Sequence, residues 1–297
     1  MTSSTRVFKE YSSAFAPGHI SGFFQPMYHE TNELLTGSRG AGLSVSLGCQ
    51  SRVKVKETRN QRITIFSDKK QIKIPVITKS LQNLIGKAPL EITVNNSVQL
   101  PIGQGFGMSA ASSLAAAYAT ADCLQIPFKK AVVAAHRAEV QLQSGLGDVI
   151  ASASGGIEIR KQPGICPDNP IIHIPGSLDV VLCVIDSPVD TKKILTDEKK
   201  ADKIALIGKK CTDDLLTNPT IENLFSLSLY FAQKTGLASD QMESILEEIN
   251  EVGLASMCML GNSIFAIGNK ERLMNKLKPY GKIFLSTVDT KGARIII

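Results

Sequence analysis

The sequence predicts an α+β protein built from two lobes. Segments typical of strands and segments typical of helices both occur along the chain, and its 297 residues are enough for one large or two moderate domains. Three prolines fall within residues 163–170, which is typical of a linker. We therefore expect an N-terminal domain over residues 1–170 and a C-terminal domain over residues 171–297.

The composition is that of an ordinary globular protein. Hydrophobic residues make up 43% of the chain and charged residues 20%. The net charge of +6 comes from 33 basic against 27 acidic residues, and the excess is concentrated between Lys192 and Lys210, as on a solvated helix surface. Because aromatic residues make up only 5% and are not interleaved with basic ones, we do not expect nucleic-acid binding. An anionic substrate is compatible with the charge.

Cysteine and histidine usage argues against zinc and disulfides. The six cysteines include no Cys-x-x-Cys pair and the four histidines are scattered along the chain. Residues 1–10 are polar, and the most apolar late run, Gly253–Gly268, is too short to span a bilayer. We expect a cytoplasmic protein without a membrane partner.

The N-terminal segments predict strands separated by turns. A first strand is expected at Tyr11–Phe15, followed by a turn at residues 16–20, Ala-Pro-Gly-His-Ile. His19 could serve a ligand site or form only a local hydrogen bond in that turn. Two alternating segments, Val53–Glu57 and Arg62–Phe66, predict antiparallel strands joined by a turn near Asn60.

Residues 28–42 are polar and glycine-rich, and they predict a loop before a strand at Leu43–Leu47. Ser38 and Arg39 are expected at the tip of this loop. Loop tips on rigid scaffolds often carry binding groups, but an exposed connector has the same composition. Further along, a helix is expected over Thr78–Ile85.

The most informative stretch is residues 101–113, Pro-Ile-Gly-Gln-Gly-Phe-Gly-Met-Ser-Ala-Ala-Ser-Ser. It follows a strand-like run and opens into a helix of small residues expected over 109–123. Glycine lets a ligand approach the main chain, and a helix N-terminus offers free N–H groups and the positive end of the dipole. Together these features predict an anion seat, most often for phosphate, although the glycines could also only turn the chain. The spacing matches neither a Walker loop nor a Rossmann Gly-x-Gly-x-x-Gly.

Three side chains near this stretch have oxygen or nitrogen atoms suited to phosphate chemistry. Ser109 begins the helix, where its hydroxyl could ligate Mg²⁺ or only cap the helix. A second helix is expected from Phe128 to Leu142, and it places His136 and Glu139 on one face. Glu139 could complete a Mg²⁺ site with Ser109, or form a surface ion pair. His136 could bind a substrate, or be a satisfied interior histidine.

A second glycine-rich segment contains a candidate base. Asp148 follows Ser-Gly-Leu-Gly at residues 144–147, where its carboxylate could accept a hydroxyl proton or only cap a short helix. A strand follows at residues 157–160. Arg160 lies on this strand on the same side as Glu158, and its planar guanidinium suits a carboxylate, although a solvated strand arginine fits the spacing equally well.

The C-terminal part predicts strands around a helical stretch. Strands are expected at 171–174, 178–185, 255–259, 264–267, 282–286 and 293–297, and helices at 201–216, 221–235, 241–251 and 270–277. Thr191 comes before the first of these helices, where it could cap a helix or reach the cleft.

The motifs together resemble those of a known family. The pattern Pro-x-x-x-Gly-x-Gly-x-Ser-Ala-Ala over residues 101–111 resembles the nucleotide-binding motif of the GHMP small-molecule kinases. The Ala-Pro-Gly turn resembles their first motif, with His19 where a Lys or Arg is usual. Residues 259–265 lie at the place of the third motif, with one glycine where several are usual. Within the superfamily, residues 15–24, the Gly-Leu-Gly-Asp-Val run and residues 155–160 are most similar to archaeal pantoate kinases.

The resemblance implies a two-lobed GHMP fold with a mixed N-terminal sheet, a ferredoxin-like C-terminal lobe and an ATP site in the cleft. It also implies ATP-dependent phosphorylation of pantoate to 4-phosphopantoate, on a route to coenzyme A, with ATP and Mg²⁺ as cofactors. Asp148 is then the catalytic residue, and Ser109 and Glu139 hold the metal. Substrate binding falls to Ser38, His136, Arg160 and Thr191. ATP binding falls to Pro101, Gly103, Gly105, Phe106, Gly107, Met108, Ser109 and Ala110.

Two alternatives follow from the same residues. The chain could be another GHMP kinase, acting on mevalonate or homoserine, or a non-catalytic member of the fold that binds a ligand or a partner. The presence of Ser109, Glu139 and Asp148 favours catalysis. A homodimer is left open.

Overall fold

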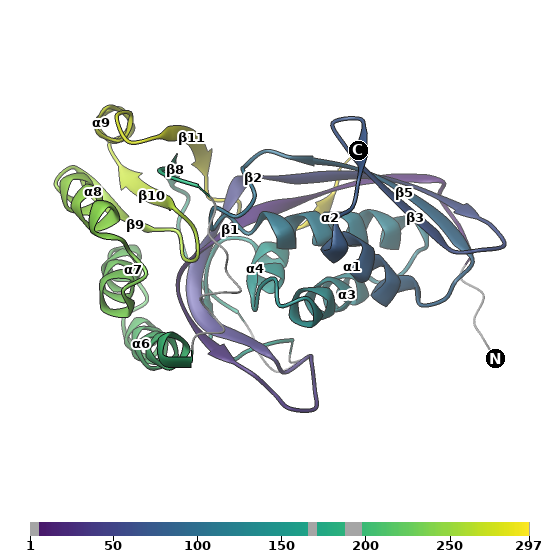
Figure 1. Ribbon diagram of the computed structural model, residues 1–297, viewed down its shortest axis with the longest axis horizontal. Coiled ribbons are helices and arrows are strands. Elements are labelled where there is room, and N and C mark those ends of the chain that lie inside the picture. The colour runs from purple at the N-terminus through teal and green to yellow at the C-terminus, as the bar shows by residue number, and fades with distance from the viewer. Residues whose placement is uncertain (1–5, 166–170, 188–197, 297) are drawn as a thin grey trace.

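A computed structural model describes residues 6–165, 171–187 and 198–296. Figure 1 shows a larger lobe, in which helices cover one face of a broad sheet, beside a smaller lobe with its own sheet. The larger sheet has the order β12-β1-β2-β5-β3-β4, and β6 and β7 extend it from β2. Its strands are β1 (Tyr11–Met27), β2 (Gly37–Glu57), β3 (Arg62–Ser67), β4 (Lys70–Ile72), β5 (Leu90–Val98), β6 (Ile157–Arg160), β7 (Ile172–Ile174) and β12 (Arg294–Ile295).

β1 and β2 are much longer than the sequence predicts. The predicted turn at residues 16–20 is wrong, because β1 runs through these residues as a strand paired with β2. A shift of register between Pro17 and Gly18 accommodates the proline within the pair. The predicted loop at Ser38 and Arg39 is also wrong, because β2 begins at Gly37. The glycines in its first part predict a loop, but Gly40 and Gly42 pack closely against the β1 backbone.

The predicted pairing of the next two strands is wrong as well. β2 and β3 are not neighbours, since β5 lies between them. β5 pairs antiparallel with β2 from Leu90 to Val98 and parallel with β3 over the whole length of β3. A short alternating pattern predicts a strand, but it does not specify which partner the strand takes.

Helices α1–α4 cover one face of this sheet (Figure 1). They are α1 (Pro75–Ile85), α2 (Met108–Cys123), α3 (Phe128–Gln141) and α4 (Asp148–Ser154). α2 is buried along almost its whole length, and its alanines and serines let it lie close to β1 and β2, with α1 and α3 packed against it and against each other. The predicted helices over 109–123 and 128–142 are confirmed in this way. α2 fixes the end of the preceding glycine loop within the core.

The smaller lobe has a four-stranded antiparallel sheet of order β11-β8-β10-β9. Its elements are β8 (Asp179–Val184), α6 (Glu198–Thr217), α7 (Ile221–Thr235), α8 (Asp240–Asn250), β9 (Gly253–Met257), β10 (Ser263–Gly268), α9 (Lys270–Leu277) and β11 (Lys282–Thr287). If these strands are numbered 1 to 4 along the chain, their order across the sheet is 4-1-3-2, with helical segments after the first and third strands, which is the ferredoxin-like arrangement.

The two lobes share strands and side-chain contacts. β7 and β12 come after residue 170 and yet hydrogen-bond within the larger sheet. The C-terminal half of β1 packs on α6 and α7, and the ring of Phe24 lies 5.7 Å from that of Phe231 in α7. The division at residue 170 stays a prediction. Among the described residues, no helix is long and apolar enough to cross a membrane.

Candidate active site

The phosphate loop, residues 101–108, presents its main chain to a cleft. Gly103, Gly105 and Gly107 have φ values of 77°, 76° and 63°, a left-handed conformation that glycine adopts at little cost. Gly107 is the N-cap of α2, and no side chain caps the helix there. The first N–H groups of α2 therefore remain available to an anion.

The phosphate loop is braced from both lobes. The N–H of His19 on β1 donates to the carbonyl of Phe106 at 3.0 Å. A Cβ on Gly105 would lie 2.9 Å from Cys258, and a Cβ on Gly261 would lie 2.1 Å from the backbone of Gln104. The turn after β9, where the third motif was expected, thus packs directly against the loop. Its single glycine is the one this close packing requires.

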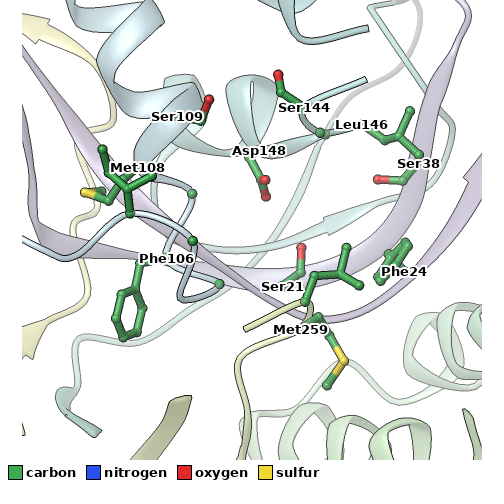
Figure 2. A pocket seen from close by; sticks show the side chains of 17 residues that line it. Ser21, Phe24, Ser38, Phe106, Met108, Ser109, Ser144, Leu146, Asp148 and Met259 are labelled. Atoms are coloured by element: carbon green, nitrogen blue, oxygen red, sulfur yellow. The ribbon is translucent and has the colours of Figure 1, made fainter. Parts of the chain in front are cut away.

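A cavity of about 180 Å³ opens beside the loop. Figure 2 shows the carboxyl group of Asp148 pointing into it, between the phosphate loop on one side and Ser38 with Leu146 on the other. Phe24, Leu146 and Met259 supply apolar wall, and the remaining lining residues are Ser21, Ser38, Ile102, Gly103, Gly105, Phe106, Gly107, Met108, Ser109, Ser144, Gly145, Gly147, Asp148 and Leu260. The cavity thus joins an anion seat to an ionisable oxygen.

Asp148 is the first residue of α4 and is 30% exposed. Its Oδ1 lies 2.7 Å from Nδ1 of His19. Burial would raise the pKa of Asp148, but the hydrogen bond from His19 and the charges of His19 and Arg160 hold it below the ordinary value of 3.8. The carboxylate is therefore ionised at neutral pH and has a fixed direction.

His19 belongs to a charge cluster that we define as His19, Asp148, Glu158 and Arg160. Nε2 of His19 lies 3.1 Å from Oε1 of Glu158, and Nη1 of Arg160 donates to the same oxygen. Burial alone would lower the pKa of His19, but the charge of Glu158 and the hydrogen bonds with both carboxylates outweigh it and raise the pKa from 6.5 to about 9. The ring is then an imidazolium that donates one hydrogen bond to each carboxylate.

Three neighbouring strands make this arrangement possible. β2 lies between β1, which carries His19, and β6, which carries Glu158. Gly42 on β2 is the register partner of Glu158, and a Cβ there would lie 2.8 Å from Nε2 of His19. The glycine leaves the space through which the imidazole ring reaches across the middle strand to the carboxylate.

Arg160 has unused hydrogen-bonding capacity. Its side chain is 2% exposed, and Nε and Nη2 have no partner within the described part of the chain. A Cβ on Gly147 would lie 3.1 Å from Nε of Arg160 and 2.6 Å from Oγ of Ser38. Both side chains therefore lie against Gly147, with Ser38 lining the cavity and Arg160 behind the wall. Two buried donors beside a hydroxyl are suited to an anionic group.

Glu139 and His136 lie deeper, behind the segment at residues 144–147. A Cβ on Gly145 would lie 2.3 Å from Oε1 of Glu139. Burial and the charge of Asp148 raise the pKa of Glu139 well above its ordinary value, and burial lowers the pKa of His136. Nε2 of His136 donates to the carbonyl of Thr36 at 3.0 Å, which leaves its Nδ1 3.9 Å from Oε2 of Glu139. Neither of these two facing atoms has a partner among the described residues.

The structure brings most of the expected site residues to one cleft. The cavity is lined by Ser38, Ser109, Asp148 and the loop residues 103 and 105–108. Glu139, His136 and Arg160 are buried just behind its wall. Pro101 at the start of the loop and Ala110 in the first turn of α2 do not line the cavity. Thr191 lies outside the described residues, so its expected role stays a prediction.

Sequence reasoning did not anticipate the partners within the charge cluster. The sequence alone assigns no role to Glu158. For His19 it allows two interpretations, a ligand-binding residue or a local hydrogen bond in a turn. Glu158 and Arg160 alternate with two isoleucines, a pattern that predicts one polar and one apolar face of a strand. In the structure all four side chains are buried. Buried charges occur as paired groups, and Glu158 and Arg160 form such a pair, which the strand pairing extends to His19.

Comparison with known proteins agrees with the geometry. Residues 73–156 match the family model for the GHMP kinases N terminal domain. The chain is 34% identical to a pantoate kinase from Methanospirillum hungatei over 96% of each chain. It is 35% identical to a pantoate kinase from Methanocaldococcus jannaschii over 89% of this chain and 95% of that one.

A solved structure described as a phosphotransferase related to the CoA biosynthesis pathway superposes with a TM-score of 0.86. That structure is 28% identical, and the match covers 96% of this chain and 98% of the other. The chain therefore belongs to the GHMP kinases and, within them, to the family of these archaeal pantoate kinases.

Proposed function

We propose that the protein transfers a phosphoryl group from ATP to the primary hydroxyl of pantoate, giving 4-phosphopantoate for coenzyme A synthesis. The family relationship over nearly the whole chain supports the reaction class and the substrate. The observation that carries the proposal for this site is the placement of the ionised Asp148 beside the phosphate loop, with the unused donors of Arg160 behind the same cavity.

Each part of the site suits one part of the two substrates. The main-chain N–H groups of the phosphate loop and of the first turn of α2 would hold the ATP phosphates. The guanidinium of Arg160 and the hydroxyl of Ser38 would bind the carboxylate of pantoate. Because Arg160 lies behind Gly147, the segment at residues 144–147 has to shift for this contact to form.

The donor set of this chain fits Mg²⁺. Magnesium prefers oxygen ligands in octahedral geometry and keeps several waters, so few protein ligands suffice. The hydroxyl of Ser109 lines the cavity, and Oε2 of Glu139 has no partner among the described residues. These two groups would hold the ion, which, when bound, neutralises charge on the transferring phosphates. A bound cation would also lower the raised pKa of Glu139.

Asp148 would act on the attacking hydroxyl. Its carboxylate would accept a hydrogen bond from the hydroxyl, direct it towards the terminal phosphorus, and take the proton as the new P–O bond forms and the bond from that phosphorus to the ADP oxygen breaks. A depressed pKa makes Asp148 a weak base, but phosphoryl transfer depends chiefly on positioning and electrostatics, so a well-oriented carboxylate is sufficient.

A substrate panel tests the proposal. ADP release would be measured with ATP, Mg²⁺ and one of pantoate, mevalonate or homoserine, and we expect turnover only with pantoate. Turnover only with mevalonate or homoserine would reassign the substrate, and none with any of them would favour a binding protein. We expect the protein to act in the cytoplasm, and light scattering of the purified chain tests whether it forms a homodimer.

A further inference from the structure

We propose that His19 is a positioning residue: its imidazolium holds Asp148 ionised and aimed at the cavity on one side, and anchors Glu158, and through it Arg160, on the other. This role rests on the proposed function. It assigns the cationic part of the first motif to a side chain that acts through two carboxylates rather than by touching phosphate.

The contacts of the ring define the role. His19 is fully buried, and both ring nitrogens face carboxylate oxygens, at 2.7 Å for Asp148 and 3.1 Å for Glu158. A neutral imidazole carries one N–H and could donate to only one of them. With two carboxylates fixed on opposite sides, only the doubly protonated ring satisfies both contacts. Burying those carboxylates without a cation would be costly.

The charges that face the ring from neighbouring elements agree with this. Asp148 faces it from α4, Glu158 and Arg160 from β6, and Glu139 acts on the same group of charges from α3. Nη1 of Arg160 lies 3.4 Å from Nε2 of His19, so two cations share Oε1 of Glu158. Glu158 thereby fixes Nη1 of Arg160, while its Nε and Nη2 stay without partners among the described residues and available to a ligand.

The main chain of His19 adds a second connection. Its N–H donates to Phe106 in the phosphate loop, and a Cβ on Gly107 would lie 2.9 Å from the carbonyl oxygen of His19. His19 on β1 is therefore in contact with the seat for ATP, with Asp148, and with Glu158, the carboxylate that fixes the substrate-binding Arg160. The spacing between these three parts is set by the position of His19.

The protonation state of His19 is measurable without any assay of activity. In protein labelled at histidine, four imidazole signals are expected, and single substitutions of His29, His136 and His173 identify the fourth. We expect that signal to remain in its charged position from about pH 6 to about pH 8 and to titrate near pH 9. Glu158→Gln should move this titration to lower pH. A His19 ring that is neutral at pH 7 would overturn the proposal, whatever the substrate of the enzyme.

Kinetics test the positioning role. His19→Asn keeps a donor towards Asp148 but removes the charge, and we expect kcat to fall about tenfold to a hundredfold, as for other supporting partners of functional side chains. The KM for ATP should change less than about twofold, because the contact with Phe106 is made by the main chain. His19→Lys, which restores a cation, should recover part of the loss.

The exposed His173 on β7 gives a matched control. His173→Gln should leave kcat unchanged. A folded His19→Asn enzyme with the kcat of the unaltered protein would refute the positioning role. If the Asn and Lys variants are both less stable but keep the kcat of the unaltered protein, His19 serves only the fold. If His19→Asn does not fold, the imidazole titration of the unaltered protein still decides the question.

Discussion

The phosphate loop and the charge cluster meet in one cleft but are built in different ways. The loop offers main-chain N–H groups and is made of glycines with left-handed φ values and small side chains. The charge cluster is made of the side chains of His19, Asp148, Glu158 and Arg160, which lie on three separate elements. A main-chain site is specified by a short run of sequence, whereas a side-chain cluster exists only after strands have paired.

This difference predicts how each region responds to substitution. In the loop, a substitution acts through backbone strain and crowding, and it should change the KM for ATP and little else. In the charge cluster, each substitution changes the electrostatics of its neighbours, so effects on kcat, on pantoate binding and on stability should be separable by residue.

Asp148→Asn should have the largest effect. The amide keeps the size of the side chain but cannot take the hydroxyl proton, so we expect kcat to fall about 10²–10⁴-fold, the usual range for a proton-transfer group. Steady-state ADP release measures it. The KM for ATP should change little, because the loop is intact. Turnover equal to that of the unaltered enzyme would remove Asp148 from the mechanism.

The contrast between the two regions also explains what sequence reasoning found. The glycine loop, α2 and the helices of the smaller lobe follow from local patterns, and their predicted positions are confirmed within a few residues. Asp148 and Arg160 stood out because their residue types suit the chemistry. The partners of His19 did not, because no local pattern says that β6 pairs with β2 or that Gly42 leaves space for a ring.

The strand errors have the same origin. Proline and glycine at residues 17–18 predicted a turn, but β2 provides a continuous partner and a register shift absorbs the irregularity. The frequent glycines at residues 37–42 predict a loop, although in this sheet Gly40 and Gly42 allow close approach of β1. Tertiary pairing thus outweighed local preference at the positions that build the charge cluster.

Arg160→Ala should come next in size. Losing a hydrogen bond between charged groups corresponds to about 1.5–3 kcal/mol, or roughly tenfold to a hundredfold in the KM for pantoate. The KM for ATP should remain close to its normal value. Arg52→Ala is the matched control, since Arg52 is exposed on β2. An equal loss towards ATP and pantoate would reject a substrate-binding role for Arg160.

Gly105→Ala tests the loop itself. The residue has φ 76°, and its added Cβ would lie 2.9 Å from Cys258, so both strain and crowding act. A left-handed L-residue costs about 1–2 kcal/mol, which predicts a KM for ATP raised by about tenfold. Gly86→Ala provides the control, because Gly86 has φ 60° with nothing within 4 Å of an added Cβ. If Gly86→Ala raises the KM for ATP as much, the effect is global and not a property of the phosphate loop.

A further expected effect, outside catalysis, is on stability as a function of pH. The pKa of His19 is raised from 6.5 in the unfolded chain to about 9 in the folded protein, so the folded state binds the proton more tightly. The stabilisation is complete below about pH 6.5 and is lost as the pH rises through about 9. We therefore expect the midpoint of urea unfolding to fall between about pH 7 and about pH 9.5 in the unaltered protein and to fall less in His19→Gln. Parallel curves for the two proteins would show that the raised pKa of His19 makes no contribution to folding, and would separate the charge cluster's role in the reaction from any role in stability.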